Sequence, residues 1–390
     1  MATAGSFSLR VCFPTALFIL AVPAHSPGAA PETKAGARVP VIYCTDLFHP
    51  HVDPDDHFDL ATLYALPGVD VRGIVLDQGE KQLQRPGRIP VTQLNHLTAR
   101  NVPVAIGLAN RLKSPSDPGL DQPEPFQAGV RLILDTLRRS EAPVALIAVG
   151  SVRDVVAAFN REPDLLRRKV SRVLCFIGEA SKEDFQEYNV GLDPQAFVGL
   201  MRSGLPVEWV PCFDGGLWQN RGHASFWKAK HEDLLRRAPP ELVQFFIYAL
   251  EHEKADPVAF LRQPVDAARK AKLFAGERNL WCTAIFASVA GRTVAYDGTH
   301  FSLTPAGALS NAGTPAGALY GFEEVSIIVT DAAVVKYDSG PGAVKVRRFA
   351  VWDPARFAEG MTRATADLLA QFPVQRSEQP ATAGKAGGLK

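Results

Sequence analysis

Six short apolar runs, rich in β-branched residues, recur along the first half of the 390-residue chain. Near-continuous hydrophobicity over six to eight residues is typical of a strand that is covered on both faces, as in a parallel sheet. The runs occupy residues 39–44, 69–76, 102–108, 143–149, 171–177 and 205–212. They predict the strands of one sheet.

Helical patterns separate these runs. Val152, Val155, Val156 and Phe159 fall at i, i+3, i+4 and i+7, which places them on one face of a helix. Asp193 followed by Pro194 is typical of a helix start, because an aspartate side chain caps the first turn and proline suits its first position. Alternation of strand and helix predicts an α/β fold, with a mostly parallel sheet flanked by helices and a Rossmann-like core.

The pattern changes after residue 222. We expect mainly helix between His223 and Arg292, over residues 223–238, 239–254 and 278–292, as a helical insertion. Strands should return at residues 323–335 and 344–352. A final amphipathic helix should follow the cap Asp353, and its apolar face would carry Phe357, Met361, Ala364 and Leu368. No internal repeat or long linker divides the chain, so we expect one domain over residues 38–375.

The two ends of the chain differ from this pattern. Arg10, the apolar run at residues 11–22 and the small residues after it predict a signal peptide within residues 1–30, and hence an exported protein, periplasmic or secreted. An uncleaved anchor is the alternative, although the run is shorter than the ~20 residues that span a bilayer, so we expect no stable membrane span. Residues 376–390 are polar and small, and predict a disordered tail.

The charge and the cysteine content of the chain limit which partners and which disulfide bonds can be expected. The formal net charge is +1 and no basic run occurs, which argues against a nucleic-acid polymer as partner. The four cysteines that follow the signal segment are widely spaced in a long chain, so we expect buried free thiols and not a disulfide scaffold. The sequence is compatible with a homo-oligomer.

An acidic loop is the strongest functional signal. Thr45 to Asp59 holds five aspartates and three histidines within fifteen residues. The loop joins a predicted strand to a predicted helix, and in an open parallel sheet ligands bind beyond the carboxyl ends of the strands. Crowded carboxylates suit a hard cation, and Ca²⁺ tolerates irregular geometry well. We therefore expect a Ca²⁺ site, against the simpler interpretation of a solvated acidic loop at a helix N-terminus.

The histidines of the loop suggest a second kind of metal site. His49, His51 and Asp53 form an H-x-H-x-D pattern, which resembles the opening motif of metallo-β-lactamase-type hydrolases that hold zinc or iron. That motif continues with histidine, and here Pro54 follows. Six strands separated by helices also differ from the sandwich which that family needs.

The acidic segment resembles the inosine-uridine-preferring nucleoside hydrolases, whose first strand runs into D-x-D-P-G-x-D-D and then a helix. Asp46 ends the strand here, and Asp55 with Asp56 opens the helix, but residues 48–52 intervene. Either Asp46 or Asp53 takes the place of the family's second aspartate, and the strand register favours Asp46.

The resemblance continues along the chain and implies further site residues. Residues 71–80 look like the family's second strand, with Glu80 where the family has asparagine, and residues 144–180 resemble the next motifs, which makes the carbonyl of Val149 a calcium ligand. Residues 186–197 are similar to A-E-F-N-x-x-x-D-P-x-A, which places Glu187 and Asn189 at the ribose hydroxyls. The resemblance implies a divergent, exported bacterial member.

One departure concerns the family's late His-Asp pair, where histidine assists the leaving base and aspartate binds calcium. Trp281 and Cys282 occupy those places here. A thiol is a poor ligand for Ca²⁺, and an indole does not act as an imidazole acid. Either another carboxylate such as Asp53 supplies the missing ligand, or the activity has drifted, with Trp281 remaining at the substrate.

The resemblance implies hydrolysis of the N-glycosidic bond of a ribonucleoside or related N-ribosyl compound by calcium-assisted attack of water, with Asp46 as general base. The expected metal ligands are Asp46, Asp53, Asp55, Asp56 and Val149, and the expected substrate contacts are Glu80, Glu187, Asn189 and Trp281. Two alternatives stay open: a non-catalytic exported ribosyl- or sugar-binding protein, and a zinc or iron hydrolase that uses His49 and His51.

Overall fold

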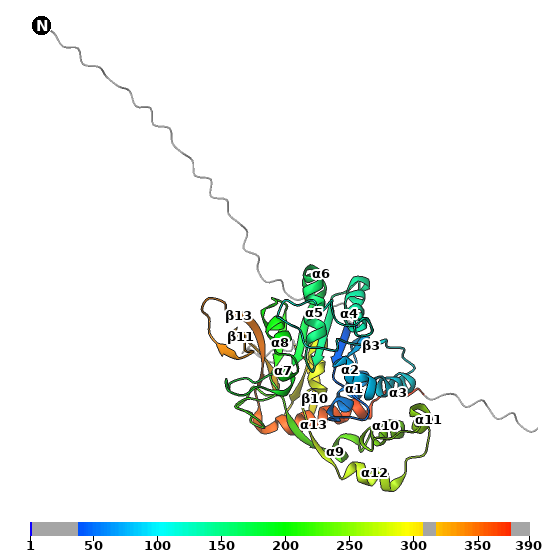
Figure 1. Cartoon of the computed structure of the whole chain (residues 1–390). Helices are drawn as coiled ribbons and strands as arrows, with labels where there is room; N and C mark the ends of the chain where they lie inside the picture. Colours follow the sequence, from blue (N-terminus) through cyan, green and yellow to red (C-terminus); the bar gives the residue numbers. More distant parts are fainter. Residues whose placement is uncertain (2–37, 307–316, 376–390) are drawn as a thin grey trace, which may run out of the picture. The chain divides into compact units, whose positions relative to one another are not determined.

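One sheet carries all six apolar runs (Figure 1). The computed structural model describes Met1, residues 38–306 and residues 317–375, so the predicted signal peptide and tail lie outside the described ranges, apart from Met1. Within these ranges the sheet has nine strands in the order β12-β11-β13-β6-β5-β4-β1-β2-β3. The expected strands are β1 (Val39–Thr45), β2 (Val69–Leu76), β3 (Val104–Ile106), β4 (Val144–Val149), β5 (Val170–Phe176) and β6 (Val207–Val210).

These six strands are parallel to their neighbours, as are β6 and β13 (Val344–Val351). Two antiparallel strands, β11 (Tyr320–Val329) and β12 (Val335–Tyr337), complete the edge beyond β13. The predicted fold class, an α/β fold with a mostly parallel sheet, is confirmed.

Both faces of the sheet are covered, which explains the continuous apolar runs. Along β1, Val41 and Tyr43 lie in one hydrophobic cluster, and Ile42 and Cys44 lie in another on the opposite face. The helices that lie between these six strands in the sequence are α1 (Asp55–Ala65), α2 (Gly79–Gln84), α3 (Arg88–Thr98), η1 (Glu124–Phe126), α4 (Ala128–Arg139), α5 (Arg153–Arg161), α6 (Pro163–Lys169), α7 (Tyr188–Leu192) and α8 (Pro194–Arg202).

The predicted helical insertion is present in part. It contains α9 (His231–Leu235), α10 (Pro240–Leu250), α11 (Pro257–Leu261) and α12 (Ala267–Phe274), which group together in Figure 1. Helices α10 and α11 pack against α3, and α9 packs against the last helix, α13 (Pro354–Ala370).

Of the three helices expected in this region, the first is present only as α9 and the third is not α-helical. Residues 223–238 contain β7 (Trp227–Lys230), which pairs antiparallel with β8 (Glu277–Leu280). In β7, buried Trp227 and Ala229 alternate with exposed lysines, a period of two that the surrounding helical residues obscured. Residues 278–292 contain the end of β8 and the 3-10 helix η2 (Thr283–Ala290).

η2 is a 3-10 helix whose first residue is bonded to a distant side chain. The N–H of Thr283 donates to the carboxylate of Asp59 at 2.9 Å, and the φ of Thr283 is +32°. Beyond η2, β9 (Arg292–Tyr296) and β10 (Phe301–Pro305) form a separate antiparallel pair.

The expected final helix and the strand at residues 344–352 are confirmed, whereas the strand expected at residues 323–335 is divided, because β11 ends at Val329 and a turn leads to β12. Asp353 caps α13 by accepting a hydrogen bond from the N–H of Arg356, and Phe357, Met361, Ala364 and Leu368 are buried along one face. Among the described residues, no helix is both long and apolar enough to cross a membrane.

Candidate active site

The carboxyl ends of β1, β2, β4 and β5 lie at one edge of the sheet. Thr45 pairs with Leu76, and Val149 with Phe176. At this edge Gly150 has a φ of +101°, and a Cβ added there would lie 3.2 Å from Oδ1 of Asp46 and 3.0 Å from Oδ2 of Asp77. The absence of a side chain at Gly150 therefore lets the two carboxylates approach the end of β4.

A cavity of about 370 Å³ opens at this edge. One group of its lining residues is acidic or polar and the other is aromatic. The first contains Asp46, Asp53, Asp55, Asp56, Asp59, Glu187 and Asn189; the second contains Phe176, Tyr188, Phe213, Trp218 and Trp281. Val149, Cys212 and Cys282 also line the cavity, and no lysine, arginine or histidine is among its described lining residues.

Asp46 follows β1 directly, as the sequence predicts. Its Oδ2 accepts a hydrogen bond from the side chain of Gln78 at 3.3 Å. Burial, and then the charge of Asp77, raise the pKa of Asp46 to about 7. Asp77 itself is held firmly, since its carboxylate accepts hydrogen bonds from both the N–H and the hydroxyl of Ser151 at 2.8 Å.

Three more carboxylates come from the first turns of α1. Asp55 and Asp56 open the helix, and Asp59 follows at helical spacing. The hydroxyl of Thr45 donates to Asp56 at 3.0 Å. Burial raises the pKa of all three, helped at Asp55 by Asp53 and at Asp56 by Asp46, and the pKa of Asp59 reaches about 7.

Asp53 and Glu80 lie differently from the other acidic candidates. Asp53 is exposed at the edge of the cavity, and its carboxylate lies 3.4 Å from the guanidinium of Arg278. Glu80 is exposed and does not line the cavity; it borders a separate depression with Lys81 and Arg111. The structure thus brings Asp53 to the cavity but not Glu80.

The two histidines of the H-x-H pattern point to different partners. Nε2 of His49 lies 2.8 Å from the carbonyl of Glu253, and its ring stacks on Tyr248. Nε2 of His51 lies 2.8 Å from Nε2 of His252. The two imidazoles therefore do not converge on one another as a metal pair.

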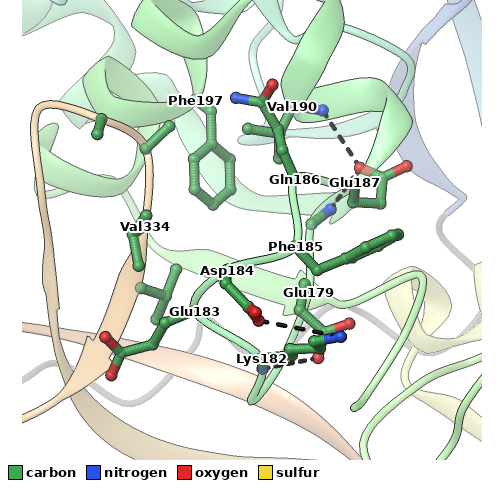
Figure 2. Close-up of a pocket in the computed structure, with 14 residues that line it drawn as sticks. Glu179, Lys182, Glu183, Asp184, Phe185, Gln186, Glu187, Val190, Phe197 and Val334 are labelled. Atoms are coloured by element: carbon green, nitrogen blue, oxygen red, sulfur yellow. Dashed lines mark hydrogen bonds and ion pairs between the residues drawn. The ribbon is translucent and has the colours of Figure 1, made fainter. Parts of the chain in front are cut away.

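Glu187 and Asn189 come from the loop and first turn of α7. Glu187 is buried and accepts hydrogen bonds from the N–H groups of Gly178, Asn189 and Val190 at 2.8, 2.9 and 3.2 Å. Figure 2 shows the bond from Val190, within a neighbouring pocket of about 320 Å³ that Glu187 also lines. Because most acceptor positions of Glu187 are used, its main effect is to fix Asn189 at the cavity.

Trp281 belongs to a group of four aromatic rings. This group lies beside the acidic wall, the side of the cavity formed by Asp46, Asp55, Asp56 and Asp59. Its ring centroid lies 5.9 Å from that of Trp218 and 6.2 Å from that of Phe213, and Phe226 completes the group. The indole N–H of Trp281 donates to the carbonyl of Cys212 at 3.2 Å. Cys282 is buried, and burial and Asp59 raise the pKa of its thiol.

The chemistry of the acidic wall suits a hard divalent cation. Several desolvated carboxylates repel one another there, and oxygen is the donor that Ca²⁺ prefers. As placed, no three His, Cys, Asp or Glu side chains in the described parts of the chain could hold a metal ion together. A cation would therefore also need main-chain or water oxygens, or a shift of side chains.

Some cavity residues were missed from the sequence. Asp59 could have been assigned, because it lies one turn from Asp55 on the same helix. Phe213 and Trp218 follow the sixth strand, at the edge where the sheet keeps its site. Cys212 and Tyr188 had no comparable signal.

The fold and the cavity define an α/β protein with a mostly parallel sheet and a cavity at the carboxyl edge of that sheet. A sequence model of the "Inosine-uridine preferring nucleoside hydrolase" family matches residues 50–295, more than half of the chain. The chain belongs to this family.

Individual relatives are distant. The pyrimidine-specific ribonucleoside hydrolase RihA of Citrobacter koseri is 29% identical over 188 residues, which are 43% of this chain and 58% of that protein. The chain thus spans less than two thirds of this curated relative. Among solved structures, the nucleoside hydrolase of Bacillus anthracis is 14% identical with a TM-score of 0.47 over 85% of this chain and 99% of that one. A plant nucleoside hydrolase, PpNRh1, is 15% identical with a TM-score of 0.48, over 87% of this chain and 99% of that one.

Proposed function

We propose that the protein hydrolyses the N-glycosidic bond of a ribonucleoside or a related N-ribosyl compound. The observation that carries this proposal is the cavity with two unlike walls, one of carboxylates and one of aromatic rings. A nucleoside has the same two parts, since its sugar presents hydroxyl groups and its base presents flat apolar faces. Membership of the nucleoside hydrolase family supports the same reaction.

Asp46, Asp55, Asp56 and the carbonyl of Val149 would hold a calcium ion. When bound, the ion supplies positive charge that offsets the repulsion among the carboxylates and orients hydroxyl oxygens. Asp53, exposed and paired with Arg278, would serve as an outer ligand at most.

Asp46 is the proposed general base. Its carboxylate lines the cavity and accepts one side-chain hydrogen bond, from Gln78, which leaves acceptor positions for the proton of an attacking water. The remaining carboxylates would stabilise the positive charge that develops on the sugar in an oxocarbenium-like transition state. Asn189, fixed by Glu187, would bind a sugar hydroxyl.

Trp281 would stack on the leaving base. Its N–H is already bound to the carbonyl of Cys212, so it orients the base and does not protonate it. The departing base would take its proton from water.

The test is release of free ribose from a panel of nucleosides, beginning with uridine and cytidine because the curated relative is pyrimidine-specific. We expect ribose release that falls at least about 100-fold in Asp46→Asn, the size of effect usual for a general base. Binding of nucleosides without ribose release would instead support the exported sugar-binding alternative. Export itself is proposed from the sequence of residues 1–30.

A further inference from the structure

A pair of histidines lies outside the cavity, where the β1–α1 loop meets the residues after α10. Nε2 of His51 and Nε2 of His252 are 2.8 Å apart, and the ring centroids are 4.2 Å apart with the planes at 78°. His252 has a φ of +54°, a left-handed backbone that residues other than glycine rarely adopt. The local backbone thus holds the His252 ring against His51.

The distance between the two nitrogens suits two ligands of one ion. Two metal–nitrogen bonds of about 2.0 Å at a right angle place the nitrogens about 2.8 Å apart, whereas a tetrahedral zinc angle would need about 3.3 Å. We propose that His51 and His252 form a two-histidine site for a transition metal of square-planar or octahedral preference, Ni²⁺ or Cu²⁺.

A histidine must be neutral to bind a metal ion, which is the usual state of histidine at pH 7 and above.

The surroundings leave the other coordination positions to water or an external ligand. His57 lies behind His51, with ring centroids 6.2 Å apart; it is fully buried and neither ring nitrogen has a hydrogen-bond partner. His49 is directed to Glu253 and Tyr248. In the described ranges no third His, Cys, Asp or Glu side chain completes the pair as placed, which limits the protein's contribution to two ligands.

Metal binding would join two segments that are otherwise far apart in the sequence. The loop that carries His51 continues into Val52 and Asp53, which line the cavity. An ion between His51 and His252 would fix this loop to the end of α10, so the site would stabilise the cavity edge without entering it.

The test is titration of the untagged protein with Ni²⁺ alone, followed by calorimetry and by visible absorption, which reports nitrogen ligands. We expect about one equivalent to bind, and a loss of affinity of at least about tenfold in His51→Gln and in His252→Gln, as for removal of one ligand of two. The matched control is His300→Gln, which changes an exposed histidine in the turn between β9 and β10 and should leave binding unchanged.

The results would separate this site from the cavity. Asp56→Asn should retain Ni²⁺ binding, because Asp56 belongs to the acidic wall. Unchanged affinity in both histidine variants, or no stoichiometric binding by the unaltered protein, would overturn the proposal and leave a simple N–H···N hydrogen bond. His252 is exposed, so its variant decides the matter even if His51→Gln fails to fold.

Discussion

The four aspartates Asp46, Asp55, Asp56 and Asp59 are neighbours in the fold because the end of a strand and the first turns of a helix meet at one edge of the sheet. Each has a raised pKa, with burial as the first cause. Such an arrangement destabilises the protein when the groups are ionised, so its presence is better explained by ligand binding than by folding.

At this scale we predict that Asp56→Asn weakens calcium binding by at least about tenfold, whereas Asp53→Asn weakens it by less than about threefold. Asparagine at position 56 keeps an oxygen that can accept from Thr45, so the variant should fold. Asp53 is exposed and already paired with Arg278, so it should contribute little to the affinity for calcium. Calorimetric titration with Ca²⁺ measures both. An equal or larger loss in Asp53→Asn would show that the inserted loop supplies a principal ligand.

A second prediction concerns Asp154, a buried carboxylate away from the cavity. It accepts a hydrogen bond from the N–H of Leu108 at 3.0 Å, and burial followed by Asp77 raises its pKa from 3.8 to about 7. The folded state binds this proton more tightly than the unfolded chain does. The contribution of Asp154 to the free energy of unfolding therefore falls as the pH rises from about 4 to about 7.

Asp154→Asn removes this dependence, so its melting temperature should gain more at pH 8 than at pH 5, relative to the unaltered protein. Thermal unfolding at the two pH values measures the difference. Asp135→Asn, in a partly exposed ion pair with Arg138, is the control and should change little at either pH. A parallel shift of Asp154→Asn at both pH values would contradict the argument.

Among the elements, the sequence predicted the strands well and the later helices poorly. The central strands β1, β4 and β6 are almost wholly buried, so they appear as continuous apolar runs, whose short length favours strands over helices. The strand β7 has only four residues, so its period of two is hard to recognise directly before α9, and η2 is buried on nearly every side and shows no clear period. The start of η2 is set by Asp59, a contact between residues 224 positions apart that no local pattern contains.

Two of the Asp-Pro helix starts allow a prediction about elements. Asp193 and Asp353 each cap the helix that begins at the next residue. Asp193 is fully buried and also accepts from the N–H of Leu112 at 2.8 Å, with Nε of Arg153 at 3.5 Å. Asp353 is partly exposed; it caps α13 and also pairs with the exposed guanidinium of Arg356 at 2.8 Å.

Asp353→Ala should lower the free energy of unfolding by about 1 kcal/mol, the usual value of a cap. Asp193→Ala should lower it by about 3 kcal/mol, because it also leaves the N–H of Leu112 without an acceptor and removes a buried carboxylate beside Arg153. Denaturant unfolding of both variants gives the two values, and each serves as the other's control. Similar losses would mean that the buried contacts of Asp193 add nothing to the cap.

For the molecule as a whole, the carboxyl edge of the sheet could be predicted as the site, because strand direction alone determines it. The loops that contribute residues to the site could not be predicted in this way. The aromatic wall comes from residues 213–226 and 281, whose approach to the acidic loop depends on the whole fold. Glu80 was assigned to the site from the family resemblance of residues 71–80, but the chain turns into α2 there and carries Glu80 to another depression.

Calcium should therefore stabilise the whole molecule and not the loop alone. Asp46 extends from the sheet, whereas Asp55 and Asp56 extend from α1, so an ion held by both elements exists only in the folded chain. A ligand that binds only the folded state stabilises it by about 2.7 kcal/mol at 100 times its dissociation constant. For a domain larger than 250 residues we expect a rise in melting temperature of roughly 5 °C.

The measurement is thermal unfolding of protein treated with a chelator, before and after addition of Ca²⁺. The rise should be absent in Asp56→Asn, which removes a ligand charge, and smaller with Mg²⁺, because Mg²⁺ demands regular octahedral geometry and sheds its water reluctantly. The histidine pair provides an internal check, since His252→Gln lies outside the cavity and should keep the full response to Ca²⁺. Identical melting temperatures with and without Ca²⁺ would show that the acidic wall holds no calcium, and the charge needed for catalysis would have to come from the substrate or from protons on the aspartates.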